Sequence, residues 1–131
     1  TEQPEVQSRV SRDELLNLRA LVRDVPTPRH VQDMVVQLIE ATHPDRAAAP
    51  EETRRYVRFG ASPRGAQAVL GSAKVRAITR GRFSVSTEDV RAVLKPALRH
   101  RLIRGFEGEA EGVTADAILD AILSHISDGK S

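Results

Sequence analysis

The sequence contains no cysteine and no tryptophan, and only one tyrosine and three phenylalanines among its 131 residues. Without cysteine, disulfide bonds and thiolate chemistry are excluded, which suits a reducing compartment. No apolar run approaches the ~20 residues that a membrane-spanning helix requires, and no signal-peptide pattern opens the chain. We therefore expect a cytoplasmic protein whose core is built from Leu, Ile, Val and Ala. The first residue is Thr1 rather than Met, which predicts a fragment or a processed chain.

Sequence motifs for catalysis are also missing. There is no Gly-x-x-x-x-Gly-Lys-Ser/Thr loop and no apolar strand ending in paired acids, so the chain cannot hold and hydrolyse a nucleoside triphosphate alone. The four histidines are scattered and have no partners at metal-ligand spacing, so we predict neither a metal site nor catalytic residues. His43-Pro44-Asp45 matches the J-domain tripeptide, but the basic helix that should precede it is missing. A turn that ends a helix is the better interpretation.

Charge is unevenly distributed along the chain. Residues 54–104 contain 13 Lys or Arg against two acids, whereas the remaining residues contain seven Lys or Arg against 16 acids. Most of the positive charge is arginine, which is suited to bidentate contacts with phosphate or carboxylate. A basic middle between acidic ends suggests an anionic partner for the middle, although a solvated, arginine-rich helix surface explains the same pattern.

Hydrophobic periodicity predicts an all-α protein, a small bundle of five to six helices with at most very short strands. Residues that typically begin helices are Ser11, Thr27-Pro28, Ser62-Pro63, Ser86 and Thr114. The first helix should end at Pro26, the second at His43-Pro44 and the third near Gly81, and Pro96 should break or kink the fourth. We expect loops at 45–53 and 105–112 and a short extended segment at 56–59.

The apolar positions of these helices predict the faces that are buried. The expected inward residues are Leu15, Leu18, Val22 and Val25 in the first helix; Val31, Met34, Val35, Leu38 and Ile39 in the second; Ala66, Val69, Leu70, Ala73 and Ala77 in the third; Val90, Val93 and Leu94 in the fourth; and Ile118, Ile122 and Ile126 in the last.

The segment Gly60-Ala61-Ser62-Pro63-Arg64-Gly65 places an arginine in the first turn of a helix. The positive end of the helix dipole disfavours a cation there by ~0.3–1 kcal/mol. Free first-turn amides together with a guanidinium form a corner that can bind an anion, and the two glycines leave room for close approach. An arginine that simply extends into solvent from an ordinary helix start explains these residues equally well.

The residues from Tyr56 to Ala68 are very similar to the "sensor 2" region of MoxR-type AAA+ ATPases. The resemblance continues through Ala73-Lys74-Val75-Arg76-Ala77, Gly81-Arg82, Val85 to Val90, Leu98-Arg99-His100-Arg101-Leu102 and Glu109 to Thr114. The opening segments Val10 to Leu15 and Val22 to Val25 fit the start of the same lid. The order of the segments is that of the family, and together they account for residues from about 10 to 126.

The resemblance implies that the chain is the C-terminal lid of such an ATPase. Residues 1–10 would be a linker from the core, residues 11–131 the lid, and the core itself, with Walker A, Walker B, sensor 1 and the arginine finger, is absent from the sequence. The isolated chain would then bind no cofactor and would not be an enzyme by itself. The full-length protein would use ATP and magnesium.

By the same resemblance, Arg64 would reach the γ-phosphate of ATP, and Gly60, Ala61, Ser62 and Pro63 would shape the helix entry beside the nucleotide. The partners would be the core, the neighbouring subunits of a homo-oligomeric, usually hexameric ring, and client proteins that include proteins with von Willebrand factor A domains. Arg99, His100 and Arg101 would face the core or a neighbouring subunit, although packing or charge matching at a helix end explains them nearly as well.

A basic helical nucleic-acid-binding module is the alternative function. The basic middle of the chain and its helical architecture support it, because phosphate contacts make affinity grow with basic charge. The scarcity of aromatic residues for base stacking, and the lack of an obvious recognition helix, argue against it.

Overall fold

The computed structural model describes residues 5 and 7–129, and this part of the chain forms seven helices and one small two-stranded sheet. The elements are α1 (Arg12–Arg23), α2 (Arg29–Ala41), α3 (Glu51–Tyr56), β1 (Val57–Phe59), α4 (Pro63–Thr79), α5 (Thr87–Leu98), β2 (Ile103–Arg104), α6 (Phe106–Ala110) and α7 (Ala115–Gly129). The chain is therefore mostly helical with very short strands, as the periodicity predicts. Of the predicted linker 1–10, residues 1–4 and 6 lie outside the described residues.

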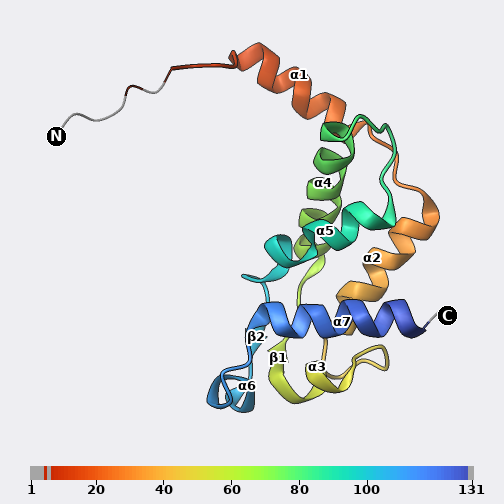
Figure 1. Cartoon of the computed structure of the whole chain (residues 1–131), viewed down its shortest axis with the longest axis vertical. Helices are drawn as coiled ribbons and strands as arrows, with labels where there is room; N and C mark the ends of the chain where they lie inside the picture. The colour runs from red at the N-terminus through yellow and green to blue at the C-terminus, as the bar shows by residue number, and fades with distance from the viewer. Residues whose placement is uncertain (1–4, 6, 130–131) are drawn as a thin grey trace.

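Helix α4 lies at the centre of the molecule, between α1 at one end and the small sheet at the other (Figure 1). Its bounds confirm the helix predicted from Pro63 to Arg80, with Arg80 as the C-cap and Gly81 in a left-handed conformation (φ 72°) that ends it. Val69, Ala73 and Ala77 are fully buried, as expected. Helices α2 and α5 pack on α4, α7 packs on α2 and α5, and the apolar faces of these helices supply most of the core.

Three of the predicted helix starts are confirmed by hydrogen bonds. The Ser11 hydroxyl accepts from the Glu14 amide at 3.1 Å, and the Thr114 hydroxyl accepts from the Ala117 amide at 3.0 Å. At α5 the Ser86 hydroxyl and the Asp89 carboxylate accept reciprocally from each other's amides, which forms a capping box. The start of α2 differs, because Thr27 makes no capping bond there and Pro28, not Thr27, is the N-cap.

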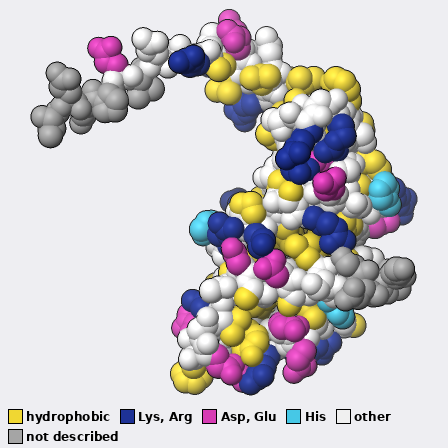
Figure 2. All heavy atoms as spheres, viewed as in Figure 1, with side chains coloured by type: hydrophobic (Ala, Val, Ile, Leu, Met, Phe, Trp, Pro, Cys, Tyr) yellow, Lys and Arg dark blue, Asp and Glu magenta, His cyan; other side chains and the backbone are white. Residues whose placement is uncertain are grey.

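Helix α1 departs most from the sequence prediction. It ends at Arg23, before the expected Pro26, and none of its residues is buried. The predicted inward residues Leu15 and Leu18 are about half exposed, whereas Val25 is buried only because it follows the helix and enters the core. The periodic pattern did identify an apolar face, but within the described part of the chain α4 covers only part of it. Hydrophobic side chains are accordingly visible on α1 at the top of the molecule (Figure 2).

Both predicted loops contain short helices. Residues 45–53 include the start of α3, and residues 105–112 include α6, which packs so closely on α3 that a side chain at Gly108 would lie 2.8 Å from the Tyr56 carbonyl oxygen. These helices are too short for hydrophobic periodicity to reveal them. Pro96 does not break α5, which continues to Leu98 with the Arg99 amide donating to the Lys95 carbonyl.

The expected extended segment is β1, which pairs antiparallel with β2. Val57 is opposite Arg104 and Phe59 is opposite Ile103, with an irregularity between the two pairs. This pairing fixes the segment that precedes α4 against the segment that follows α5. The entrance of α4 is therefore tied to the end of α5, although about 40 residues separate them in the sequence.

Candidate functional site

Arg64 lies in the first turn of α4, directly after Pro63 at the first helical position. Its side chain is exposed, and within the described part of the chain it forms no ion pair. Ser62 is the N-cap but makes no side-chain capping bond. The first turn of this 17-residue helix thus combines an uncapped N-terminus with an unpaired guanidinium, an arrangement that attracts anions.

The glycines on either side of Arg64 contact the protein itself. A Cβ atom on Gly60 would stand 2.5 Å from the carbonyl oxygen of Thr42. A Cβ atom on Gly65 would stand 3.0 Å from the Ala61 Cβ atom and 3.1 Å from Leu98. Close approach within the fold therefore requires glycine at position 60 and favours it at position 65, a reason different from the room for a ligand that the sequence suggests.

The three consecutive residues Arg99, His100 and Arg101 have different surroundings in the structure. Arg99 forms a two-point ion pair with Asp116, with both nitrogen–oxygen distances at 3.1 Å. His100 is exposed. Arg101 lies beside the entrance of α4, because its Cδ atom would be 3.6 Å from a Cβ atom on Gly65. Arg101 is also exposed and has no ion pair among the described residues, so it brings a second basic side chain to the turn that holds Arg64.

At the other end of α4, two arginines bind a buried acid. Asp89 is 0% exposed, and its carboxylate accepts hydrogen bonds from Arg82 at 2.6 Å and 2.7 Å and from Arg76 at 2.7 Å. The bonds from Arg82 lower the pKa of Asp89 well below its usual range; burial opposes this shift, and the bonds from Ser86 and Arg76 add to it. The sequence indicated Asp89 only as part of a helix cap. The capping pattern did not mark it as the acid shared by two arginines that precede it by 7 and 13 residues.

Ion pairs partly neutralise the basic middle of the chain. Five of its basic residues pair with acids: Arg55 with Glu107 and Glu111, Arg76 and Arg82 with Asp89, Lys95 with Asp120, and Arg99 with Asp116. Basic and acidic side chains accordingly lie next to each other in the lower part of the molecule, around α3 and α6 (Figure 2). The charge segregation along the sequence therefore becomes, in part, charge pairing in space.

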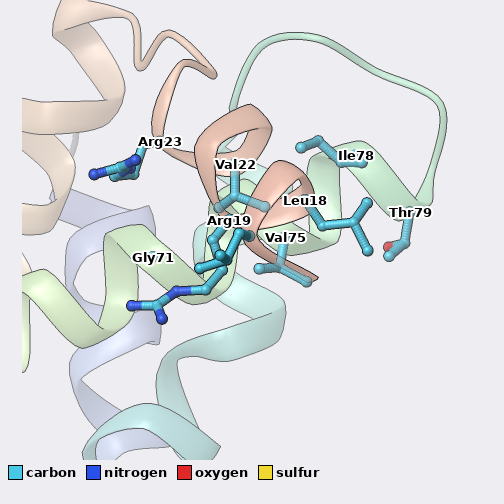
Figure 3. A pocket seen from close by; sticks show the side chains of 9 residues that line it. Leu18, Arg19, Val22, Arg23, Gly71, Val75, Ile78 and Thr79 are labelled. Carbon is cyan, nitrogen blue, oxygen red and sulfur yellow. The ribbon is translucent and has the colours of Figure 1, made fainter. Parts of the chain in front are cut away.

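A groove of about 740 Å³ lies between α1 and the C-terminal half of α4. Leu18 and Val22 of α1 face Val75 and Ile78 of α4 across it, and Arg19 and Arg23 lie at its edge (Figure 3). The lining is mainly apolar, and Gly71, which has no side chain, adds no bulk to the α4 side of the groove. The groove adjoins α4 from Gly71 onward, whereas Arg64 lies in the first turn of the same helix, and we regard the groove as a separate feature.

Residues 5 and 7–129 contain neither a metal-binding cluster of side chains nor a membrane-spanning helix. No group of three or more His, Cys, Asp or Glu side chains in this part of the chain is placed to hold a metal ion. None of the helices described above has the length and apolar character needed to cross a membrane.

Comparison with known proteins identifies the class of domain. Residues 49–122 match the model of the AAA lid domain. This match covers more than half of the chain, and the chain therefore belongs to the AAA lid domain family.

The relatives place this lid near MoxR proteins. The chain is 27% identical over 124 residues to Chaperone MoxR1 of Mycobacterium tuberculosis, covering 95% of the chain and 33% of the relative. It is 33% identical over 100 residues to Protein MoxR of Paracoccus denitrificans, covering 75% of the chain and 29% of the relative. The crystal structure of an ATPase candidate from Cytophaga hutchinsonii superposes with a TM-score of 0.81 and 29% identity, over 86% of the chain and 34% of that structure.

These matches show a lid domain of the MoxR family of AAA ATPases. The chain spans about a third of the length of the relatives that it matches. The similarity to an ATPase thus concerns the lid alone. The residues predicted to contact the nucleotide, Gly60 to Arg64, lie inside the matched region, and their role stays a prediction.

Proposed function

We propose that this chain is the nucleotide-responsive lid of its ATPase, in which Arg64 contacts the γ-phosphate of ATP held by a separate ATP-binding part. The observation that carries the proposal is the unpaired, exposed guanidinium in the first turn of α4. A charge-assisted contact with the γ-phosphate would be lost on hydrolysis, and the angle of the lid would change with it. This makes Arg64 a sensor 2 residue that couples hydrolysis to motion.

The chemistry of the α4 entrance fits a phosphate group. It offers cationic nitrogen donors from Arg64, with Arg101 nearby, and the positive end of a long helix. It offers no cluster of carboxylates for magnesium among the described residues. We therefore assign the magnesium ligands to the ATP-binding part, where the ion would neutralise phosphate charge.

At the level of the assembly, we propose that the lid moves within a homo-oligomeric, usually hexameric ring that remodels or activates client proteins, among them proteins with von Willebrand factor A domains. The relationship to Chaperone MoxR1 supports a chaperone-like role. The alternative of a nucleic-acid-binding module is weakened because ion pairs already occupy five of the basic residues that it would need.

The test is Arg64→Ala in the chain joined to its ATP-binding part. Loss of one charge-stabilising donor typically costs about 10²-fold in rate, and we expect a decrease of that order in ATP turnover. The variant should also lose any difference in lid closure between ATP and ADP, measured by fluorescence transfer between lid and core. Arg91→Ala is the matched control, because Arg91 is an exposed arginine of α5. Normal turnover and normal closure in Arg64→Ala would rule out the assigned role.

A further inference from the structure

The end of α2 holds the segment that leads into α4. Thr42 and His43 directly follow α2, and their side chains bind the two backbone polar atoms of Ala61. The Thr42 hydroxyl oxygen accepts from the Ala61 amide at 3.0 Å, and the His43 Nε2 atom donates to the Ala61 carbonyl oxygen at 2.7 Å. We call this set of contacts the Thr42–His43 clamp. It joins residues 18 and 19 positions apart in the sequence.

The Thr42 side of the clamp is buried and closely packed, and His43 is partly buried. Thr42 and Ala61 are both 0% exposed, and the Thr42 hydroxyl also donates to the Ile39 carbonyl oxygen at 2.6 Å, which fixes its orientation. The backbone at Gly60 approaches the Thr42 carbonyl so closely that a Cβ atom would stand 2.5 Å from it. The segment before α4 is thus held by a hydroxyl, an imidazole and a backbone contact, all from the end of α2.

The entrance of α4 lacks a side-chain cap. The Ser62 side chain makes no capping bond, and Pro63 has no N–H to donate. Together with the β1–β2 pairing further back in the chain, the clamp on Ala61 therefore fixes the direction in which the chain enters α4, three residues before Arg64. A hollow of about 350 Å³, lined in part by His43, Arg58 and Gly60, lies beside this segment, so the clamp borders an accessible surface.

We infer that Thr42 and His43 are positioning residues that orient Arg64 toward the bound nucleotide, and this inference rests on the proposed function. A charged group must stand within a fraction of an ångström of its working position, and a displacement of about 1 Å can reduce a rate 10²-fold. The clamp acts on Arg64 through the backbone, without touching the nucleotide. It also links α2 mechanically to the entrance of α4, so that displacement of α2 would alter the direction of Arg64.

Paired substitutions separate positioning from general stability. Thr42→Val removes the hydroxyl at nearly constant volume, and Thr42→Ser retains it. His43→Leu removes the ring N–H, and His43→Gln keeps an N–H donor at the same distance along the side chain. Local order is measured in the 131-residue chain by hydrogen exchange of the amides within residues 61–66, where all but Pro63 have an N–H, with residues 69–77 of α4 as the internal reference.

We expect Thr42→Val and His43→Leu to raise exchange at residues 61–66 about tenfold relative to 69–77, and Thr42→Ser and His43→Gln to restore it. In the chain joined to its ATP-binding part, the first two variants should lower ATP turnover at least tenfold with little change in KM, and the conservative variants should recover it. Unchanged exchange at residues 61–66 would overturn the clamp as the device that fixes the α4 entrance.

Different results would contradict the proposed function of Arg64 and the positioning role of Thr42 and His43. If Arg64→Ala impairs turnover but Thr42→Val and His43→Leu do not, the positioning inference is wrong and the proposed function stands. If Arg64→Ala has no effect, the proposed function is wrong, and the clamp has no nucleotide-sensing role even where hydrogen exchange responds. Recovery by His43→Gln supports the donated bond, whereas equal loss in His43→Gln and His43→Leu would show that the imidazole acts by shape instead.

Discussion

The two ends of α4 use arginine in opposite ways. At the C-terminal end, Arg76 and Arg82 bind Asp89, which is completely buried, at distances of 2.6–2.7 Å. At the N-terminal end, Arg64 is exposed and lacks an ion pair with any described residue. Arginine therefore stabilises the fold at the C-terminal end of α4 and is available to a ligand at the N-terminal end, 12 to 18 residues earlier in the sequence.

This difference shows why counting basic residues is a poor guide to function. The helix dipole favours cations at a C-terminus and disfavours them at an N-terminus. Arg76 lies in the last turn of α4, where the dipole stabilises it, and an internal acid neutralises it as well. Arg64 lies where the dipole opposes it and no acid compensates within the described residues. An arginine retained at the unfavourable end is therefore the better candidate for contact with an external anion.

The largest effect should come from removing the acid at the C-terminal end. Asp89→Asn keeps the shape of the side chain but leaves Arg76 and Arg82 facing an uncharged amide. Breaking a buried ion pair costs about 3–5 kcal/mol in the free energy of unfolding, and we expect the lower end of this range because Arg76 and Arg82 are 18% and 38% exposed. Urea unfolding followed by circular dichroism measures the loss. Asp116→Asn is the control, because the exposed pair of Asp116 with Arg99 should contribute less than about 1 kcal/mol. Equal losses in the two variants would contradict the comparison.

A smaller effect should separate the arginines themselves. Arg82→Gln removes the charge-assisted hydrogen bonds from Arg82 to Asp89. A hydrogen bond to a charged group contributes about 1.5–3 kcal/mol to the free energy of unfolding. Arg64→Gln alters an exposed side chain without such bonds and should change the free energy of unfolding by less than about 0.5 kcal/mol. Thermal and urea unfolding of both variants test this contrast. A strong destabilisation by Arg64→Gln would mean that Arg64 serves the fold, and would remove the basis for assigning it to a ligand.

Periodicity and capping residues predicted the central part of the fold well. The bounds of α4, the caps at Ser11, Ser86 and Thr114, and the buried faces of α2 and α7 follow from local sequence signals. The short helices α3 and α6 did not, because neither is long enough to show a periodic pattern. The exposure of α1 was also missed, since an apolar stripe indicates a face that can be buried but not what buries it.

The candidate site was predicted only in part. The segment Gly60 to Arg64 was identified from its residue types and from resemblance to a family, and the structure places it at the entrance of α4. The contacts that hold it were not predicted, because Thr42 and His43 act across 18 or 19 residues and carry no local signal. His43 was interpreted as the end of a helix, which it does follow, but the bond to Ala61 depends on tertiary packing. Long-range contacts of this kind are invisible to patterns with a period of two to four residues.

The smallest of the three effects is a dependence on acid pH. Because hydrogen bonds from Arg82 and Arg76 lower the pKa of Asp89 in the folded state, the unfolded chain binds a proton first as pH falls. The stabilisation from Asp89 is therefore fully present above its unfolded pKa of about 3.9, and is lost as pH falls below that value toward the folded pKa. Between pH 7 and pH 3 the stability advantage of the wild type over Asp89→Asn should shrink by about 1 kcal/mol. Urea unfolding of both proteins at each pH isolates this contribution, since their other carboxylates are shared. A difference that stays constant down to pH 3 would show that the charge of Asp89 does not stabilise the C-terminal end of α4, and the contrast with Arg64 would then rest on packing alone.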